Sequence, residues 1–327
     1  MAVMDSAWGA THLMRNEVFS SQVKDIFQDE VYARQWVNMT SELPDGMNLK
    51  INSIGELTMD EAAESVELPT RRMDTGQFIF NINEYKGTKV AFTDEMFEDD
   101  FMAAQMIART PEKMMRAFDV QFETDVLATV NKAGGQTLND GNIINERRHR
   151  IAGSGTGRKL SLADFAYAKQ ALKKAHAPMQ NLIAVVDPSV EFDLDITSNI
   201  VDISNNPQWQ GIVETGIGSG TRFIRNIYGF DVYTSDYLDT YVSGESSLTD
   251  YAGNTVAPVA GDKMALFFTA AGDASPFIGA FRRNPTVKSW RAEEIGTEYH
   301  EMRTRYGLGL YRPESIVSVW HSDPLSA

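Results

Sequence analysis

Apolar side chains recur at helical spacing over residues 93–133, the longest segment of the chain with helical character. The stripe that they form consists of Phe97, Phe101, Ala104, Ala108, Met115, Phe118, Phe122, Val126 and Val130. Residues three and four positions apart share one face of an α-helix, so this stripe predicts one long amphipathic helix. Thr93 suits its N-cap, and the acidic residues that follow suit the positive end of its dipole. Thr110 and Pro111 resemble a second N-cap, so we expect a kink or break near Pro111.

Two segments before this helix alternate apolar and polar residues with the period of a β-strand. The alternating apolar residues are Met47, Leu49 and Ile51 in the first segment and Phe78, Phe80 and Ile82 in the second. The Lys86-Gly87-Thr88 sequence is expected to end the second strand. We interpret residues 47–92 as a long two-stranded arm. Because an isolated hairpin is marginally stable in water, the arm favours a partner surface, and a hairpin folded onto its own domain is the alternative.

The N-terminal region is predicted to be an arm followed by a helix. Residues 22–37 carry apolar side chains on one side and predict that helix, and Pro44-Asp45-Gly46 predicts a turn after it. The first twenty residues show no clean period. They suit either an extended arm lying on a neighbouring molecule or a frayed terminus.

Residues 161–270 predict a compact α/β unit. Ser161, followed three residues later by Asp164, begins a helix in the manner of a capping box. Residues 182–186 and 264–268 are continuous apolar runs, which are typical of buried strands. Strands of this kind need cover on both faces, so the unit is expected to have its own core.

Long strands are predicted after this unit. Residues 297–311 alternate charged and other side chains, and both signs of charge are present. Such a strand suits cross-strand pairing or a polar contact between subunits. Residues 316–320 form a last apolar strand.

The composition is that of a folded protein with an acidic surface. A chain of 327 residues exceeds the length at which one core usually stops growing, so we expect two domains or one domain with long extensions. The formal net charge of −15 opposes binding to phosphate backbones, because affinity for nucleic acid depends largely on Lys and Arg. If such a protein lies beside DNA, it encloses the nucleic acid rather than binding its phosphate backbone tightly. An ordinary acidic surface explains the charge equally well.

The sequence shows no catalytic, cofactor-binding or metal-binding pattern. The absence of Cys excludes disulfides, thiolate metal sites and Cys nucleophiles. The Gly-rich run at 216–220 lacks the Gly-Lys-Ser/Thr ending of a phosphate loop, and no two of the five His residues have the spacing of a zinc helix. No apolar run approaches the ~20 residues that span a bilayer, and no signal peptide is visible. We therefore expect neither an enzyme nor a membrane partner.

Two short sequences add to the order of these elements: residues 227–235 (IYGFDVYTS) and residues 303–314 (RTRYGLGLYRPE). Together with that order, they resemble the major capsid proteins of tailed phages with the Hong Kong 97-type fold. The resemblance covers nearly the whole chain and implies an α+β fold built around a long spine helix. The implied parts are an N-terminal arm (1–45), an extended hairpin loop (46–92), a peripheral domain (93–150 and 276–312) and an axial domain (151–275 and 313–327).

This resemblance implies a structural protein that self-assembles into the hexamers and pentamers of an icosahedral shell around double-stranded DNA. The shell would form the virion capsid after assembly in the host cytoplasm, without a cofactor or sequence-specific DNA binding. Because the arm begins almost at the first residue, a separate scaffolding protein is expected, with a portal and, in some shells, a decoration protein. The alternatives are an encapsulin-like nanocompartment shell and, from another class, a cytoplasmic α/β enzyme that uses residues 161–270.

Charged residues of the loop tip and of the long C-terminal strand are the candidate contacts between subunits. These residues are Glu61, Glu64, Glu67, Arg71, Arg72, Glu301, Arg303 and Arg305. Exposed ion pairs each contribute only ~0–1 kcal/mol, but a shell repeats every contact many times, so weak contacts suffice. Some relatives crosslink a loop Lys to an Asn of the neighbour. Residues 51–85 contain no Lys, so we expect no such crosslink from the tip.

Overall fold

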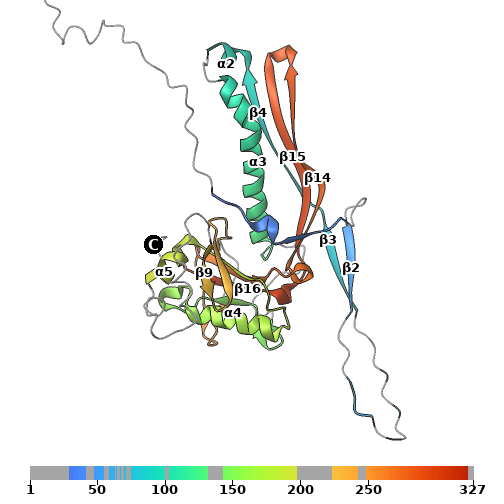
Figure 1. Cartoon of the computed structure of the whole chain (residues 1–327), viewed down its shortest axis with the longest axis vertical. Helices are drawn as coiled ribbons and strands as arrows, with labels where there is room; N and C mark the ends of the chain where they lie inside the picture. The colour runs from blue at the N-terminus through green and yellow to red at the C-terminus, as the bar shows by residue number, and fades with distance from the viewer. Residues whose placement is uncertain are drawn as a thin grey trace, which may run out of the picture.

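The chain combines an elongated part, a compact α/β part and a projecting hairpin (Figure 1). The computed structural model describes residues 29–41, 48–54, 75–99, 103–131, 143–196, 223–241 and 248–322 and, between the second and third of these, residues 59–62, 64, 67 and 70. A long helix lies beside long strands in the elongated part, and the hairpin leaves the molecule where the elongated and compact parts meet. Among the described residues, no helix combines the length and the apolar character needed to cross a bilayer.

The elongated part is a four-stranded sheet with a helix packed across one face. The strand order is β1 (Val37–Met39), β14 (Phe277–Ala292), β15 (Thr297–Leu310) and β4 (Glu84–Thr93). β14, β15 and β4 are antiparallel, whereas β1 adds to β14 in parallel. β4 leads directly into α2 (Asp94–Asp99), and α3 (Ala103–Ala128) then runs back along the sheet. This sheet is called the peripheral sheet below.

The compact part is built on a six-stranded sheet that is buried on both faces. The strand order is β7 (Arg150–Ala152), β16 (Ile316–His321), β13 (Lys263–Thr269), β8 (Leu182–Val186), β10 (Phe230–Thr234) and β9 (Phe223–Ile227). α4 (Leu162–Lys174) and α5 (Pro188–Ile196) pack against one face of the sheet. The short elements are η1 (Ala33–Gln35), β5 (Ile143–Ile144), β6 (Arg147–Arg148), η2 (Thr156–Arg158), β11 (Leu248–Thr249), β12 (Thr255–Val256), η5 (Gly272–Ala274), η6 (Glu293–Ile295) and η7 (Pro313–Ser315).

Helix α3 forms as the apolar stripe predicts, and its C-terminal half enters the main core. Phe118, Phe122 and Val126 are buried in a cluster that also includes Tyr306 and Trp320. One helix therefore supplies core residues that face both sheets. This placement explains why the segment is helical over so many turns, because helix stability in proteins comes chiefly from packing of the apolar face.

Of the kink or break predicted near Pro111, the break is wrong, and the kink stays a prediction. Helix α3 continues through Pro111, and a separate short helix, α2, ends at Asp99 instead. Thr110 is an interior residue rather than an N-cap, because its hydroxyl donates to the carbonyl of Met106 one turn earlier at 2.9 Å. Thr93 does act as the cap of α2, since its Oγ1 accepts a bond from the Met96 amide at 3.4 Å. Burial of the following apolar stripe offsets the hydrogen bond lost at proline.

The helix predicted over residues 22–37 is also wrong in its described part. From residue 29 onward the chain forms only the turn η1 and then strand β1. Trp36 and Val37 are buried, and Val37 pairs with Phe277. Tertiary pairing with β14 therefore decides the conformation here. Residues 1–28 lie outside the described residues.

Strand β4 passes through the sequence that was expected to break it. Gly87 pairs with Arg303 in the middle of the strand, and the interruption falls at Ile82 and Asn83 instead. A side chain at Gly87 would lie 2.7 Å from the carbonyl oxygen of Met302. Glycine is therefore needed for close approach of the two strands rather than for a turn.

The hairpin formed by β2 (Asn48–Ile54) and β3 (Thr75–Asn81) confirms the predicted strand pair. Its base is held by an apolar cluster in which Phe78, Phe80 and Ile82 pack against Ile278 and Ala280 of β14. Its far end is the Ile54–Thr75 pair, which is about 20 Å from the base at the usual rise of a strand. In the part of the hairpin that the structure describes, the apolar anchor therefore lies at the base.

His149 is buried in the compact part and makes its stability depend on pH. Its Nδ1 lies 2.8 Å from the Ile316 carbonyl, and burial lowers the pKa of its side chain below the ordinary value, against the effect of that bond. Below about pH 6.5 the unfolded chain binds a proton that the folded chain does not, so stability falls as the pH falls, by up to ~1.4 kcal/mol per pH unit. Denaturant unfolding at pH 7.5 and 5.5 should show a larger loss for the wild type than for His149→Gln. Equal losses would contradict this assignment.

Candidate assembly surface

The two faces of the peripheral sheet differ in what covers them. On one face, side chains of β4 and β15 such as Lys86, Met302 and Tyr306 point to α3. Because neighbouring residues of a strand point to opposite faces, the residues between them form the other, outer face. α3 is therefore fastened on one side, and the outer face is available for other contacts.

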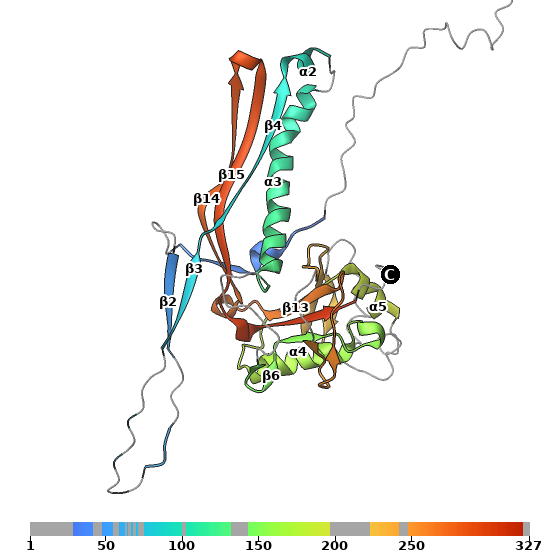
Figure 2. The ribbon, with the colours of Figure 1, turned by 180° about the vertical axis from the view of Figure 1, so that it is seen from behind.

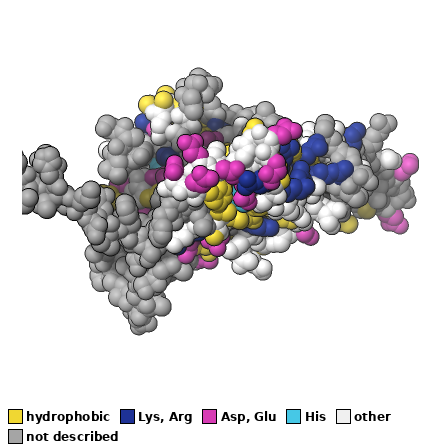
Figure 3. All heavy atoms as spheres, turned by 90° about the horizontal axis from the view of Figure 1, so that it is seen from above, with side chains coloured by type: hydrophobic (Ala, Val, Ile, Leu, Met, Phe, Trp, Pro, Cys, Tyr) yellow, Lys and Arg dark blue, Asp and Glu magenta, His cyan; other side chains and the backbone are white. Residues whose placement is uncertain are grey.

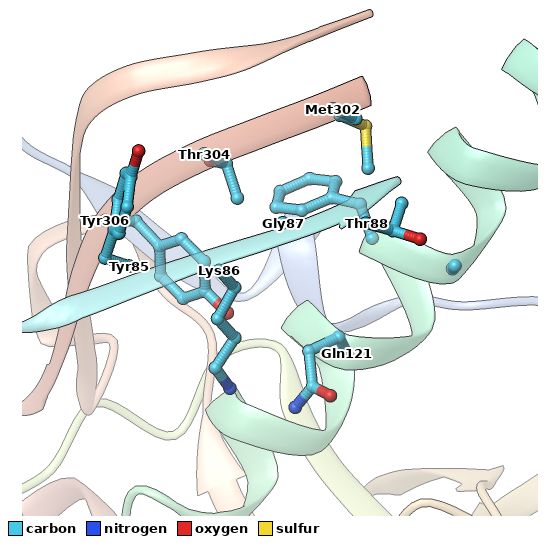
Figure 4. Close-up of a pocket in the computed structure, with 10 residues that line it drawn as sticks. Tyr85, Lys86, Gly87, Thr88, Gln121, Met302, Thr304 and Tyr306 are labelled. Carbon is cyan, nitrogen blue, oxygen red and sulfur yellow. The ribbon is translucent and has the colours of Figure 1, made fainter. Parts of the chain in front are cut away.

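A buried carboxylate fastens α3 to the sheet through Lys86 and Tyr306, two residues that line a cavity between the helix and the strands (Figure 4). Asp125, 4% exposed, accepts a hydrogen bond from the Tyr306 hydroxyl at 2.6 Å and forms an ion pair with Lys86. Burial raises the pKa of Tyr306 above its ordinary value, and the bond to Asp125 raises it further, so the phenol remains a donor. Lys86 and Gln121 border a cavity of about 430 Å³ between the helix and the strands. The contacts of Lys86 and Tyr306 with Asp125 therefore position the helix against the strands.

A second buried carboxylate two residues earlier fastens the other side of α3. Glu123 is 1% exposed and accepts hydrogen bonds from the Tyr32 amide at 2.7 Å and the Ser235 hydroxyl at 2.6 Å. Tyr32 precedes η1, and Ser235 directly follows β10 of the compact part. Glu123 and Asp125 thus join the N-terminal segment, the compact part and the peripheral sheet to one helix.

Cationic side chains of three neighbouring strands share the outer face. By register, Arg305 lies opposite Tyr85, Arg303 opposite Thr286 and Gly87, and Glu301 opposite Lys288 and Lys89. Arg283 also pairs with Arg305, but the register shifts on both sides of Arg283, and it belongs to the less exposed residues of β14, so it is not assigned to this face. We call the four cations of these rows the cationic face: Lys89, Lys288, Arg303 and Arg305. Figure 3, seen from above, shows Lys and Arg side chains gathered together on a chain whose net charge is −15.

Aromatic rings extend the cationic face toward the tip of the β14–β15 hairpin. Trp290 lies opposite Tyr299 with 5.6 Å between their ring centroids, and Trp290 is 40% exposed. The ammonium of Lys89 lies 3.8 Å from the Tyr299 ring centroid and 5.1 Å from that of Trp290. Exposed aromatic and Arg side chains in one patch are typical of the central residues of protein interfaces.

The lower part of the outer face is covered by the chain's own hairpin. A side chain at Gly307 would lie 2.5 Å from the Asn81 carbonyl oxygen, and one at Gly309 would lie 3.2 Å from the Phe80 ring. These glycines let the base of the β2–β3 hairpin approach β15 closely. The hairpin then runs away from the β14–β15 tip in both views (Figures 1 and 2). The cationic face lies beyond this cover.

The structure brings some of the candidate contact residues together and separates others. Glu301, Arg303 and Arg305 lie side by side on the outer face, and Glu301 forms an ion pair with Arg303. Glu61, Glu64 and Glu67 are exposed, beyond the far end of the hairpin. Arg71 and Arg72 lie outside the described residues. Whether any of these residues contacts a neighbouring subunit stays a prediction.

Sequence reasoning missed the residues that lie beside β15 on both faces of the peripheral sheet. Lys288 and Lys89 belong to strands whose register across the sheet no local pattern specifies. The alternation of exposed and less exposed residues along β14 was the one signal that could have indicated an outward face. The Asp125–Lys86–Tyr306 contacts join residues far apart in the chain and had no sequence signal.

Comparison with known proteins identifies the class of this molecule. A family model described as phage capsid protein matches residues 77–319, which is most of the chain and includes α3 and most of both sheets. The chain belongs to the phage capsid protein family. It is therefore a major capsid protein, a structural subunit of a bacteriophage shell and of the virion, rather than an enzyme. No curated protein sequence matches the chain significantly.

Solved structures support the same fold at low sequence identity. A Mycobacterium phage Che8 structure is 15% identical with a TM-score of 0.65, and covers 94% of this chain and 97% of its own. The capsid structure of the cyanophage P-SCSP1u is 13% identical with a TM-score of 0.65, covering 95% and 94%. The mature capsid of bacteriophage PhiM1 is 12% identical with a TM-score of 0.66, covering 94% and 92%. The expected α+β fold of Hong Kong 97-type capsid proteins is confirmed, and the α/β-enzyme and nanocompartment alternatives are not favoured.

Proposed function

We propose that this capsid protein forms the hexamers and pentamers of an icosahedral shell that encloses double-stranded DNA. The observation that carries this proposal is the β2–β3 hairpin, which is anchored at its base and extends away from its own subunit (Figure 1). A two-stranded hairpin is marginally stable by itself in water. A hairpin of this kind is best explained by an adjacent subunit on which it lies.

The parts of the chain then have separate roles in the shell. The hairpin is the extended loop (46–92) that overlaps an adjacent subunit, and the spine helix with the peripheral sheet forms the peripheral domain (93–150 and 276–312). The compact sheet belongs to the axial domain (151–275 and 313–327), which lines the centres of hexamers and pentamers. The two carboxylates of α3 support the role of this helix as the spine of the subunit, because they join it to both parts. Identical contacts between subunits, repeated around the shell, generate closed symmetric assemblies.

Other partners follow from the same proposal. Assembly takes place in the host cytoplasm, with a separate scaffolding protein, a portal and, in some shells, a decoration protein. The DNA is enclosed without sequence-specific binding, in keeping with the net charge of −15.

The native size of the purified protein tests this proposal. Light scattering and negative-stain microscopy on one sample should show closed shells or capsomer-sized rings. Adding the scaffolding protein, if the isolated subunit forms only rings, should convert rings to shells. A monomer at every protein concentration and salt concentration, with and without scaffold, would contradict shell formation by the hairpin contact.

Reversal of the basic pair at the loop tip tests whether the tip makes an assembly contact. Arg71→Glu with Arg72→Glu should abolish closed particles while leaving the circular dichroism and melting temperature of the subunit unchanged. The physical reason is that many copies of one weak ion pair are replaced by repulsion. Arg71→Lys with Arg72→Lys retains the charge and should still assemble. Normal particles from the reversed variant would remove the tip charges from the list of assembly contacts.

A further inference from the structure

We propose that a basic patch of the compact part contacts the phosphates of the double-stranded DNA that the shell encloses. The patch consists of Arg147, Arg148, Lys169, Lys173 and Lys174 and is called the α4 patch below. This inference rests on the proposed function, which supplies the DNA, and it adds the surface that meets the DNA. The contact is non-specific, because it consists of cations that displace counterions from phosphates.

Hydrogen bonds hold strand β6 beside the C-terminal half of α4. The Tyr167 hydroxyl of α4 donates to the Arg148 carbonyl at 3.2 Å and accepts from the Arg148 amide at 3.1 Å. The side-chain amide of Asn145 donates to the Lys174 carbonyl at 3.0 Å. Burial raises the pKa of Tyr167, and the charges of Arg147 and Arg148 oppose that rise, which shows that both cations lie close to the helix. Cations of the strand and of the helix therefore share one surface.

Lys169 and Lys173 extend the α4 patch along the helix. They are one helical turn apart, about 6 Å along the axis. The Lys169 ammonium donates to the Tyr228 carbonyl at 2.6 Å, in the turn between β9 and β10. Figure 2 shows α4 and β6 on the side of the compact part that is turned away from α3 and the peripheral sheet. The patch thus lies on a surface separate from the cationic face.

The charge of the α4 patch exceeds what local structure requires. Glu146 lies 4.0 Å from Lys174, but its side chain is 85% exposed, so water weakens this ion pair. Five positive charges and this one negative charge leave a formal charge of +4. The dipole of α4 places only about half a negative charge at this end of the helix. Helix capping therefore does not account for the whole patch, and an external anion is the better explanation.

The net charge of −15 does not prevent a local contact of this kind. At physiological ionic strength, exposed charges separated by more than ~8 Å are largely screened from each other. A phosphate that lies on the α4 patch is therefore attracted by the patch, although the chain as a whole is acidic. The acidic remainder of the surface keeps the contact weak and dependent on salt.

Phosphates fit the α4 patch better than a protein partner does. The exposed residues of α4 are Ala166, Gln170, Lys173 and Lys174, and none of them is large and apolar. Protein interfaces are instead enriched in aromatic residues and depleted in Lys. The cationic face, where Trp290 lies beside the charges, has that composition. Lys is a compact point charge that binds phosphate without an aromatic neighbour.

Binding of DNA to the full-length protein before shell closure tests the proposal. A short fluorescein-labelled double-stranded DNA is titrated with subunits or rings at several salt concentrations, and anisotropy reports binding. Lys169→Gln with Lys173→Gln should weaken binding, and the slope of log K against log salt should fall by about 0.9 for each phosphate contact removed. Lys169→Arg with Lys173→Arg retains the charge and should bind as the wild type does.

A matched control separates the α4 patch from total charge. Arg109→Gln with Lys113→Gln removes two exposed cations at the same helical spacing from α3 and should leave DNA binding unchanged. Circular dichroism and melting temperatures establish that each variant is folded. Equal binding by the wild type and the folded Lys169/Lys173 variant would overturn the proposal, and so would equal losses in that variant and the control.

Closed shells show which way the α4 patch faces. Rings should bind the labelled DNA, whereas closed empty shells should not, because added DNA cannot reach an inner surface. In DNA-filled particles, Lys173 and Lys174 should react with a small amine-reactive reagent more slowly than in emptied particles, and Lys113 should react equally in both. Patch-dependent binding by closed shells, or equal reaction at all three lysines, would contradict a contact with enclosed DNA.

The outcomes separate this inference from the proposed function. If shells form and the Lys169/Lys173 variant binds DNA as the wild type does, the further inference fails and shell formation stands. If neither rings nor shells form under any condition, the proposed function fails, and a contact inside a shell fails with it. An acidic scaffolding protein is the rival partner. Loss of scaffold binding in the same variant, with DNA binding unchanged, would assign the patch to that protein and overturn the proposal.

Discussion

Replacing Asp125 by Ala is expected to lower the free energy of unfolding by about 2–4 kcal/mol, the sum of a lost charged hydrogen bond and a partly exposed ion pair. The Tyr306 hydroxyl would lose its acceptor in a buried position, at a site where the structure places a 2.6 Å bond. The Lys86 side chain is 31% exposed, so water replaces part of its lost attraction and its share of the effect is small. The helix would remain covered by the apolar cluster but would lose its polar tie to the peripheral sheet.

Urea unfolding followed by circular dichroism measures this effect, and Tyr306→Phe is the matched control. The control removes one hydroxyl and leaves Asp125 with Lys86, so we expect a loss of about 1–2 kcal/mol. The double variant Asp125→Ala with Tyr306→Phe should cost less than the sum of the two, because one bond is removed twice. Strict additivity would show that the Asp125–Tyr306 bond does not stabilise the fold.

Gly307→Ala is expected to cost about 1–3 kcal/mol, the usual range for overpacking in a well-packed site, and to reduce particle yield severely. A side chain here would lie 2.5 Å from the Asn81 carbonyl oxygen and 3.0 Å from the Ile82 Cα, and backbone atoms cannot rotate away. The base of the extended hairpin would therefore have to shift from β15. Because assembly depends on where the hairpin points, a small shift at the base displaces its far end by more.

Gly309→Ala separates this cause from a general effect of filling glycines. Its new side chain would meet the Phe80 ring at 3.2 Å and the Phe78 ring at 3.4 Å, and side-chain rings can adjust. We expect this variant to keep most of its stability and its particles. Melting temperatures and negative-stain counts on both variants give the comparison. Equal losses at Gly307 and Gly309 would rule out backbone contact as the reason.

Elements that are specified by local pattern were predictable. The capping box of Ser161 and Asp164 begins α4 as expected, with Asp164 Oδ2 accepting a bond from the Ser161 amide at 2.8 Å. Strands β8, β13 and β16 appear where continuous apolar runs predict buried strands. The β2–β3 pair and the long strand β15 follow from their alternation. In each case the residues that specify the element lie within it or a few positions from its ends.

Elements that depend on distant partners were mispredicted. Trp36 and Val37 leave a helical pattern because β14 offers a strand edge and a buried site for the Trp ring. Pro111 remains inside α3 because the packed stripe beyond it outweighs one missing hydrogen bond. Gly87 continues a strand because β15 approaches it closely. Propensity is a weak preference, and burial of large side chains overrides it.

The amino-acid pattern alone was enough to specify the long helix, the paired strands and their order, and with two short sequences it pointed to the capsid family. It also supplied the charges of β15, since Glu301, Arg303 and Arg305 are visible in the sequence. Only the folded structure shows that Lys89 and Lys288 join them, and that Asp125 lies beside Tyr306. The physical reason is register. A slip of one residue moves every side chain of a strand to the opposite face, and that register is set by contacts between segments some two hundred residues apart.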